Sequence, residues 1–147
     1  MNKIEHIRNI LNSFEKLTGR VLIERTSPYK DFMNIETGAF VLVSHNELKK
    51  PVLNYGNHFA LGLWEMSWED FVKTPSSRTA EVYFREKRSA MLEVVSKQGY
   101  FENYEGIRIS STGKRFKIKN ATIWNVNNDK GKFIGQAAYF ESVEYVK

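Results

Sequence analysis

The chain has 147 residues, no cysteine, 14% aromatic residues and a formal net charge of +5 from 22 basic and 17 acidic residues. Its length suits a single domain with a hydrophobic core, and the missing thiols exclude disulfides, thiolate zinc sites, cysteine nucleophiles and flavin photochemistry through a cysteine adduct. Basic and acidic residues are interspersed and no apolar run is long enough to span a membrane, so we expect a cytoplasmic protein that binds neither membranes nor nucleic acid.

The first segment is an amphipathic helix predicted over residues 2–18. Its apolar residues recur at intervals of three and four, which places them on one helix face: Ile4, Ile7, Ile10, Leu11, Phe14 and Leu17. Gly19 suits the end of the helix. We therefore divide the chain into an N-terminal helix, residues 1–19, and a main domain, residues 20–147. The apolar face is expected to lie on the outer face of a sheet or to pair with a second copy in a dimer.

The middle of the chain predicts two strands followed by helices. In chain order we expect an irregular stretch at 20–37, strands at 39–45 and 51–55, short helices after Asn57 and Ser67, and a long helix at 78–98. Asn57 is a suitable N-cap, and Ser67 to Asp70 resembles a capping box. The long helix ends at Gly99, and its expected inward residues are Ala80, Phe84, Met91, Val94 and Val95.

Three antiparallel strands are predicted to complete the chain, at 104–111, 115–126 and 132–145, with turns between them. Side chains alternate between the two faces of a strand. In the second of these strands, one face is expected to hold Phe116, Ile118, Asn120, Thr122, Trp124 and Val126. In the third, Gln136 is expected to share a face with Ile134, Ala138 and Phe140.

Three segments carry a family resemblance: PVLNYGNHFALGLWEMSWEDFVKTPSSRTAE from Pro51, QGYFENYEGIRISSTGKRFKIKNATIWNV from Gln98, and GQAAYF from Gly135. In this order they resemble the MEKHLA domain, a PAS-like family, in its stand-alone bacterial form. The resemblance implies an α+β fold with a five-stranded antiparallel sheet of order 2-1-5-4-3 and helices on one face. It also implies a sensory or regulatory role with small-molecule binding and dimerisation. No ligand and no catalytic residue carries over from the family.

A ligand pocket is expected between the inner sheet face and the helices, because polar side chains interrupt the apolar strand faces. A buried amide without a partner costs a few kcal/mol, so such groups bond either the protein itself or a ligand. The small residues Gly135, Ala137 and Ala138 are expected to leave room. The candidate ligand-binding residues are His45, Asn54, Tyr55, Trp64, Trp68, Asn120, Thr122, Trp124 and Gln136. Asn54 and Asn57 also suit structural ties between strand and helix, and the tryptophans suit core positions.

We expect a non-catalytic sensory module that binds a small organic ligand and acts through a homodimer or a partner protein. The cofactor is left open, but haem is not expected because residues 78–98 contain no histidine. The three histidines are too scattered in the sequence for a metal site. Two alternatives stay open. A small isomerase or dehydratase with a curved sheet would use His45, with Tyr55 and Arg108 behind it, and a protein-interaction module would have no cavity.

Overall fold

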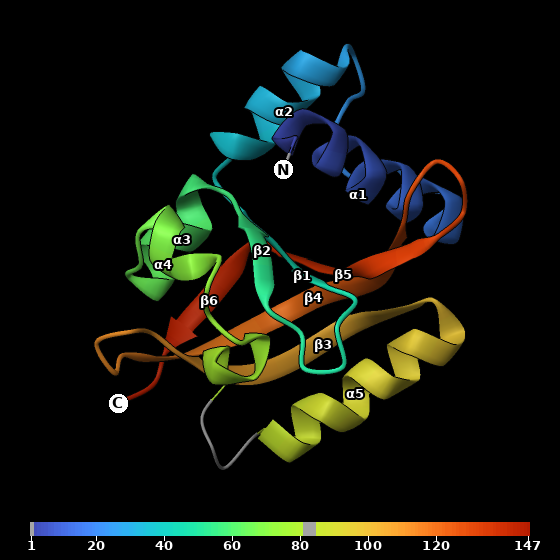
Figure 1. Cartoon of the computed structure of the whole chain (residues 1–147). Coiled ribbons are helices and arrows are strands. Elements are labelled where there is room, and N and C mark those ends of the chain that lie inside the picture. Colours follow the sequence, from blue (N-terminus) through green and yellow to red (C-terminus); the bar gives the residue numbers. More distant parts are fainter. Residues whose placement is uncertain (1, 81–84) are drawn as a thin grey trace.

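The structure is a computed structural model that describes residues 2–80 and 85–147. The elements follow in the order α1 (Lys3–Thr18), α2 (Pro28–Glu36), β1 (Val41–Asn46), β2 (Leu53–Gly56), α3 (His58–Trp64), α4 (Trp68–Phe71), the 3-10 helix η1 (Ser76–Thr79), α5 (Arg85–Gln98), β3 (Tyr100–Ile109), β4 (Arg115–Asn127), β5 (Phe133–Phe140) and β6 (Ser142–Tyr145). Figure 1 shows helices on both sides of one twisted sheet.

The sheet is antiparallel and has the order β2-β1-β5-β4-β3, so the predicted order of five strands is confirmed. A sixth strand was not predicted. The last predicted strand, residues 132–145, divides at Glu141 into β5 and β6. Both halves pair with the same neighbour, β4, in antiparallel register.

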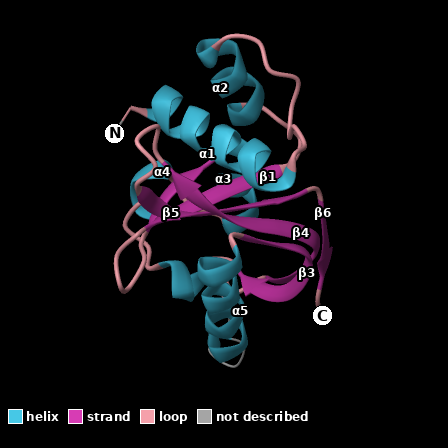
Figure 2. Cartoon of the chain, turned by 90° about the vertical axis from the view of Figure 1, so that its right-hand side faces the viewer, coloured by secondary structure: helices cyan, strands magenta, loops and turns pink. Residues whose placement is uncertain are grey.

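Two apolar clusters lie on opposite faces of this sheet, one under α1 and α2 and the other under α3, α4 and α5. Figures 1 and 2 show α1 and α2 on one side of the sheet and α5 on the other. The outer cluster contains Ile10, Phe14 and Trp124. The inner cluster contains Trp64, Phe116 and Phe140, which meet edge to face. The sheet is therefore covered on both faces, which fixes the register of strands that have apolar residues on each side.

The N-terminal helix lies on the outer sheet face, which was one of the two predicted positions. The Asn2 Oδ1 atom accepts a hydrogen bond from the Glu5 N–H at 3.1 Å, and Gly19 ends the helix with a φ of 72°. Its fully buried side chains include Ile7, Ile10 and Leu11. The apolar face predicted to cover a sheet or a dimer mate is thus buried within its own chain.

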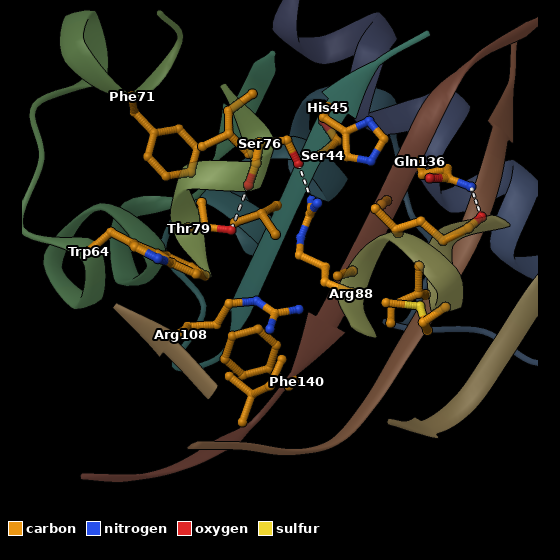
Figure 3. Close-up of a pocket in the computed structure, with 18 residues that line it drawn as sticks. Ser44, His45, Trp64, Phe71, Ser76, Thr79, Arg88, Arg108, Gln136 and Phe140 are labelled. Carbon is orange, nitrogen blue, oxygen red and sulfur yellow. Dashed lines mark hydrogen bonds between the residues drawn. The ribbon is translucent and has the colours of Figure 1, made fainter. Parts of the chain in front are cut away.

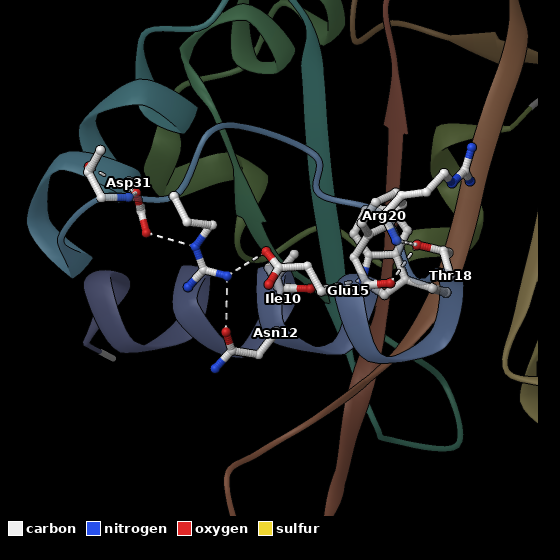
Figure 4. A network of polar contacts seen from close by, with 10 residues as sticks. Ile10, Asn12, Glu15, Thr18, Arg20 and Asp31 are labelled. Atoms are coloured by element: carbon white, nitrogen blue, oxygen red, sulfur yellow. Dashed lines mark hydrogen bonds and ion pairs between the residues drawn. The ribbon is translucent and has the colours of Figure 1, made fainter.

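The irregular segment predicted at residues 20–37 contains α2, which begins at the N-cap Ser27 with proline in the first turn. Arg25 joins α2 to α1: its Nε donates to Asp31 Oδ2 at 2.8 Å, and its Nη1 donates to Glu15 Oε2 at 2.6 Å and to Asn12 Oδ1 at 3.0 Å (Figure 4). This network orients α2 against the helix that covers the sheet.

Asn57 ties the edge of the sheet to α3, as its predicted capping role requires. Its Oδ1 accepts from the N–H groups of Leu42 and Ala60, each at 3.2 Å. Its Nδ2 donates to the carbonyls of Ile35 and Phe40, each at 2.9 Å. All four bonds of a fully buried amide are therefore made within the protein.

The predicted phase of β4 is correct as far as Ile118 and wrong beyond Asn120. Asn120 has a φ of 54° and stays exposed, and the pairing with β3 shifts between Tyr104 and Gly106. One extra residue in a strand reverses the side-chain alternation that follows it. The inner face of β4 therefore continues with Ala121 and Ile123, while the outer face, toward α1, holds Thr122, Trp124 and Val126.

The sequence suggested that Gly135 leaves room for a ligand. This expectation is wrong, because the backbone of β1 fills the space. A Cβ atom at this position would lie 2.0 Å from the His45 carbonyl oxygen, and the φ of Gly135 is +148°. The pairing of β5 with β4 shifts register at this point, between Val126 and Asn127 of β4. As a result Gln136, Ala138 and Phe140 face inward as predicted, but Ile134 packs in the outer cluster.

The long helix α5 is described from Arg85 to Gln98, and its predicted first residues Arg78 and Thr79 belong instead to η1. Ala80, expected on its inward face, instead forms an antiparallel bridge with Arg108. Met91 and Val95 are buried as predicted, whereas Val94 is 39% exposed, so that expectation is wrong. The remaining expected inward residue, Phe84, lies outside the described residues.

Candidate functional site

A cavity of about 60 Å³ lies between the inner sheet face and the helices α3, η1 and α5 (Figure 3). Its walls are mainly apolar and include Val43, Leu53, Phe71, Ile118 and Phe140. Cavities of this size hold a few waters or a small organic molecule. The chemistry of the site is set by the few polar side chains that reach it.

Arg88 enters the cavity from α5. Only 8% of the residue is exposed, and its Nη2 donates to the Ser76 hydroxyl at the start of η1. Thr79 supports this turn by donating from Oγ1 to the Ser76 carbonyl at 2.8 Å. Burial and the neighbouring charge of Arg108 lower the pKa of Arg88 to about 9, which leaves the guanidinium charged at neutral pH.

Arg108 enters the same space from β3 and is 6% exposed. Its Nη1 donates to the Ile107 carbonyl at 3.1 Å and its Nη2 to the Tyr104 hydroxyl at 3.3 Å, while the guanidinium lies 5.4 Å from the Tyr104 ring centroid. No carboxylate of residues 2–80 or 85–147 forms an ion pair with Arg88 or Arg108. Within the described part of the chain, the two buried cations of this cavity thus have only neutral partners.

His45 presents a lone pair to the cavity. Its Nδ1 lies 2.9 Å from the Asn46 carbonyl oxygen, which can only accept, so the proton is assigned to Nδ1. The buried Nε2 has no hydrogen-bond partner among the described residues. Burial lowers the pKa of His45 to about 4, so the ring is neutral at pH 7 and Nε2 is an acceptor.

Trp64 and Gln136 complete the polar lining. The Trp64 Nε1–H is buried and lacks a hydrogen-bond acceptor within the described part of the chain. The Gln136 amide nitrogen, in contrast, lies within bonding distance of Asn125 Oδ1 at 3.0 Å, Ser96 Oγ at 3.1 Å and the Leu92 carbonyl at 3.3 Å. Gln136 therefore ties β5 to α5, whereas Trp64 keeps a free donor.

Three of the nine candidate residues line this cavity: His45, Trp64 and Gln136. Two others bond within the outer half of the molecule. The Trp124 Nε1–H donates to the Ile10 carbonyl at 3.1 Å, and the Tyr55 hydroxyl donates to Glu36 Oε2 at 2.6 Å. Trp124 turns outward because of the Asn120 bulge described above.

The other four candidates also lie away from the cavity. The Asn54 Oδ1 atom accepts from the Ser44 hydroxyl at 2.5 Å. Trp68 packs against the Tyr55 ring and has Lys3 Nζ 3.7 Å from its ring centroid. Thr122 lies on the outer face of β4, and Asn120 is exposed at the bulge.

Arg88 is not among the residues predicted from the sequence, although its position in the helix carries a signal. Arg88 precedes Met91 by three positions and Val95 by seven, so it shares their helix face. A charged residue in such a stripe is usually assigned to solvent. The sequence suggests Arg108 only as an accessory to His45 in an enzyme. The structure brings Arg108 and His45 to one cavity, whereas Tyr55 lies elsewhere.

The described residues offer no group of three or more His, Asp or Glu side chains placed to hold a metal ion. They also contain no helix that is both long and apolar enough to cross a bilayer.

Comparison with solved structures identifies the fold. The PAS domain of a protein from Colwellia psychrerythraea matches with a TM-score of 0.66 and 12% identity, over 80% of this chain and 95% of that one. A light-oxygen-voltage domain studied with a flavin analogue matches with a TM-score of 0.63 and 11% identity, over 81% and 86%. The PAS domain of a LuxR-family transcriptional regulator from Burkholderia thailandensis, in complex with ethanol, matches with a TM-score of 0.56 and 12% identity. The match covers 78% of this chain and 95% of that one.

These identities establish the architecture alone, and that architecture is PAS-like, as predicted. Comparison with curated proteins gave no match. The family model for the MEKHLA domain matches residues 4–145, which is almost the whole chain. With this match and a PAS-like fold, the chain belongs to the MEKHLA domain family.

Proposed function

We propose that this chain is a non-catalytic sensory module that binds a small organic ligand in the cavity between the sheet and α5. The observation that carries the proposal is the free hydrogen-bonding capacity of the cavity wall. Two buried atoms there, His45 Nε2 and Trp64 Nε1, have no partner within the described residues. A buried polar atom without a partner costs about 1–3 kcal/mol, so a ligand that supplies partners is favoured at this place.

The match to a PAS domain that holds ethanol supports a ligand of a few non-hydrogen atoms. The cavity of about 60 Å³ has the corresponding size. A larger cofactor such as flavin or haem would need the inner core to open.

The strand β1 is the proposed route from the cavity to the other side of the sheet. His45 faces the cavity, and the preceding Ser44 bonds His6 of α1, with 2.9 Å between Ser44 Oγ and His6 Nε2. A ligand that moves His45 therefore acts on the strand that holds α1. The signal then leaves through association with a second copy or with a partner protein.

An enzyme is the second class considered, and the state of His45 argues against it. A general base works best when its pKa lies near the working pH. Burial lowers the pKa of His45 to about 4, so this ring is a weak base at neutral pH.

Native mass spectrometry of the purified protein tests the binding proposal, since it reports a co-purifying small molecule and the number of subunits together. We expect a bound mass that is released on denaturation. Hydrogen exchange with and without that molecule tests the route, and a change is expected at Ser44 and at the start of α1. A protein that carries no small molecule and takes up none from a metabolite extract would contradict the proposal.

A further inference from the structure

The cavity holds two cations that no carboxylate among the described residues neutralises. Figure 3 shows Arg88 from α5 and Arg108 from β3 extending into the same space. Each is more than nine-tenths buried, and neither pairs with a carboxylate in the described part of the chain. Burying an unpaired charge is costly, and a second charge of the same sign nearby adds to that cost.

Most of the donors of these two side chains have no partner among the described residues. A guanidinium carries five N–H donors in a planar fork that matches the two oxygens of a carboxylate. Arg88 has the Ser76 hydroxyl as partner, and Arg108 has the Ile107 carbonyl and the Tyr104 hydroxyl. Free donors on two forks therefore converge on a cavity whose walls are otherwise mainly apolar.

We propose that the ligand of this module is a short-chain organic carboxylate whose charged group lies between Arg88 and Arg108. This inference rests on the proposed function, because it specifies the ligand of the same cavity. The apolar walls formed by Val43, Ile118 and Phe140 contact the carbon body. An inorganic oxyanion would leave those walls without a partner, which is why a carboxylate is favoured over phosphate.

His45 adds a preference among carboxylates. Its Nε2 is an acceptor without a partner among the described residues, so it suits a ligand that carries a hydroxyl donor. A 2-hydroxy acid supplies the anion for the arginines and the donor for the histidine. The volume of about 60 Å³ restricts the carbon body to a few atoms.

This site borders a groove beside α5. A wider groove lies between α5 and the loop that joins β1 to β2, and it shares His45, Arg88, Leu92 and Gln136 with the cavity. Arg88 and His45 thus lie where the groove meets the cavity. The ligand's charged end and its hydroxyl meet their partners as it enters.

The test compares acids with their neutral isosteres at constant ionic strength. Glycolate and lactate are titrated against glycolamide and lactamide, with inorganic phosphate as the third arm, by calorimetry and by thermal unfolding. We expect the acids to raise the melting temperature by roughly 6–10 °C at a hundredfold excess over Kd. The amides and phosphate are expected to bind at least tenfold more weakly.

Arg88→Met and Arg108→Met are expected to weaken acid binding by about 10- to 100-fold each, because each removes a charge-assisted hydrogen-bonding fork. Lys97→Met is the matched control, since it removes an exposed cation from the same helix. If either arginine variant does not fold, the Arg Nε–H resonances of the wild-type protein replace it. Two of these resonances are expected to shift on saturation with glycolate.

Each of the remaining outcomes refutes a defined part of the proposal. Equal binding of acid and amide, acid binding that survives both arginine substitutions, or Nε–H resonances that do not shift would refute the carboxylate and leave a neutral-ligand sensor. Phosphate binding as tight as that of glycolate would refute the organic ligand. Failure of every probe, together with no co-purifying molecule, would refute the proposed function itself.

Discussion

Two buried histidines make the stability of this protein depend on pH below neutrality. His6 on α1 and His45 on β1 are each 8% exposed. Burial lowers the pKa of both to about 4, from an ordinary value of 6.5. Between these two values the unfolded chain binds more protons than the folded chain, so stability falls as the pH falls.

The size of the effect follows from the two pKa values. From pH 7 to pH 5, each histidine is expected to reduce the free energy of unfolding by about 2 kcal/mol, and the pair by about 4 kcal/mol. Burial alone would raise the pKa of Asp31, but the hydrogen bonds from Thr26 and Arg25 lower it overall. Buried carboxylates of this kind lose their contribution to the free energy of unfolding only at lower pH. The window between pH 7 and pH 5 therefore reports the histidines.

Urea unfolding at half-unit steps of pH measures this slope directly. His6→Gln and His45→Gln are each expected to remove about half of it, and the double variant nearly all of it. His58→Gln is the control, because His58 is exposed at the start of α3. A free energy of unfolding that stays constant from pH 7 to pH 5, or a full slope in the double variant, would refute the assignment of neutral buried rings.

Substitutions at three further positions test the packing around the sheet by urea unfolding. Trp124→Phe removes the hydrogen bond to the Ile10 carbonyl and is expected to lower the free energy of unfolding by about 1–3 kcal/mol. A loss below about 0.5 kcal/mol would contradict the outward position of this ring. Asn57→Ala leaves several buried backbone groups without partners and is expected to cost about 3 kcal/mol; a neutral result would show that the amide is replaceable by water. Asn120 has a positive φ, so Asn120→Gly is expected to keep or raise the free energy of unfolding, and Asn120→Val to lower it by about 1–2 kcal/mol. Equal stabilities of the two variants would argue against the bulge.

The order of the first five strands and of the helices other than α2 followed from the sequence, because it depends on features repeated over many residues. The apolar spacing from Ile4 to Leu17 specified a helix, and the observed α1 agrees with it. Strand alternation was equally informative up to Ile118. It failed at Asn120, because a bulge needs only one residue that tolerates a left-handed backbone, and asparagine serves many other purposes.

The site was harder to predict than the fold for a related reason. Trp124 and Thr122 were placed inward because a single inserted residue reverses every later side chain. Arg88 was not among the predicted site residues, and charged residues are seldom buried without a partner. The most informative residue of the cavity is thus one that departs from the usual rule.

The packing of α1 limits how a ligand can signal through it. Four large apolar side chains of α1 are buried against the sheet and its neighbours: Ile7, Ile10, Leu11 and Phe14. Each stabilises the docked helix by about 1.5–3 kcal/mol, which gives roughly 6–12 kcal/mol in total as an upper estimate. A ligand at a hundredfold excess over its Kd supplies only about 2.7 kcal/mol. Under the proposed function, ligand binding is therefore too weak to release α1, and the expected response is a small displacement of the docked helix through the Ser44–His6 contact, which leaves most of α1 protected from hydrogen exchange.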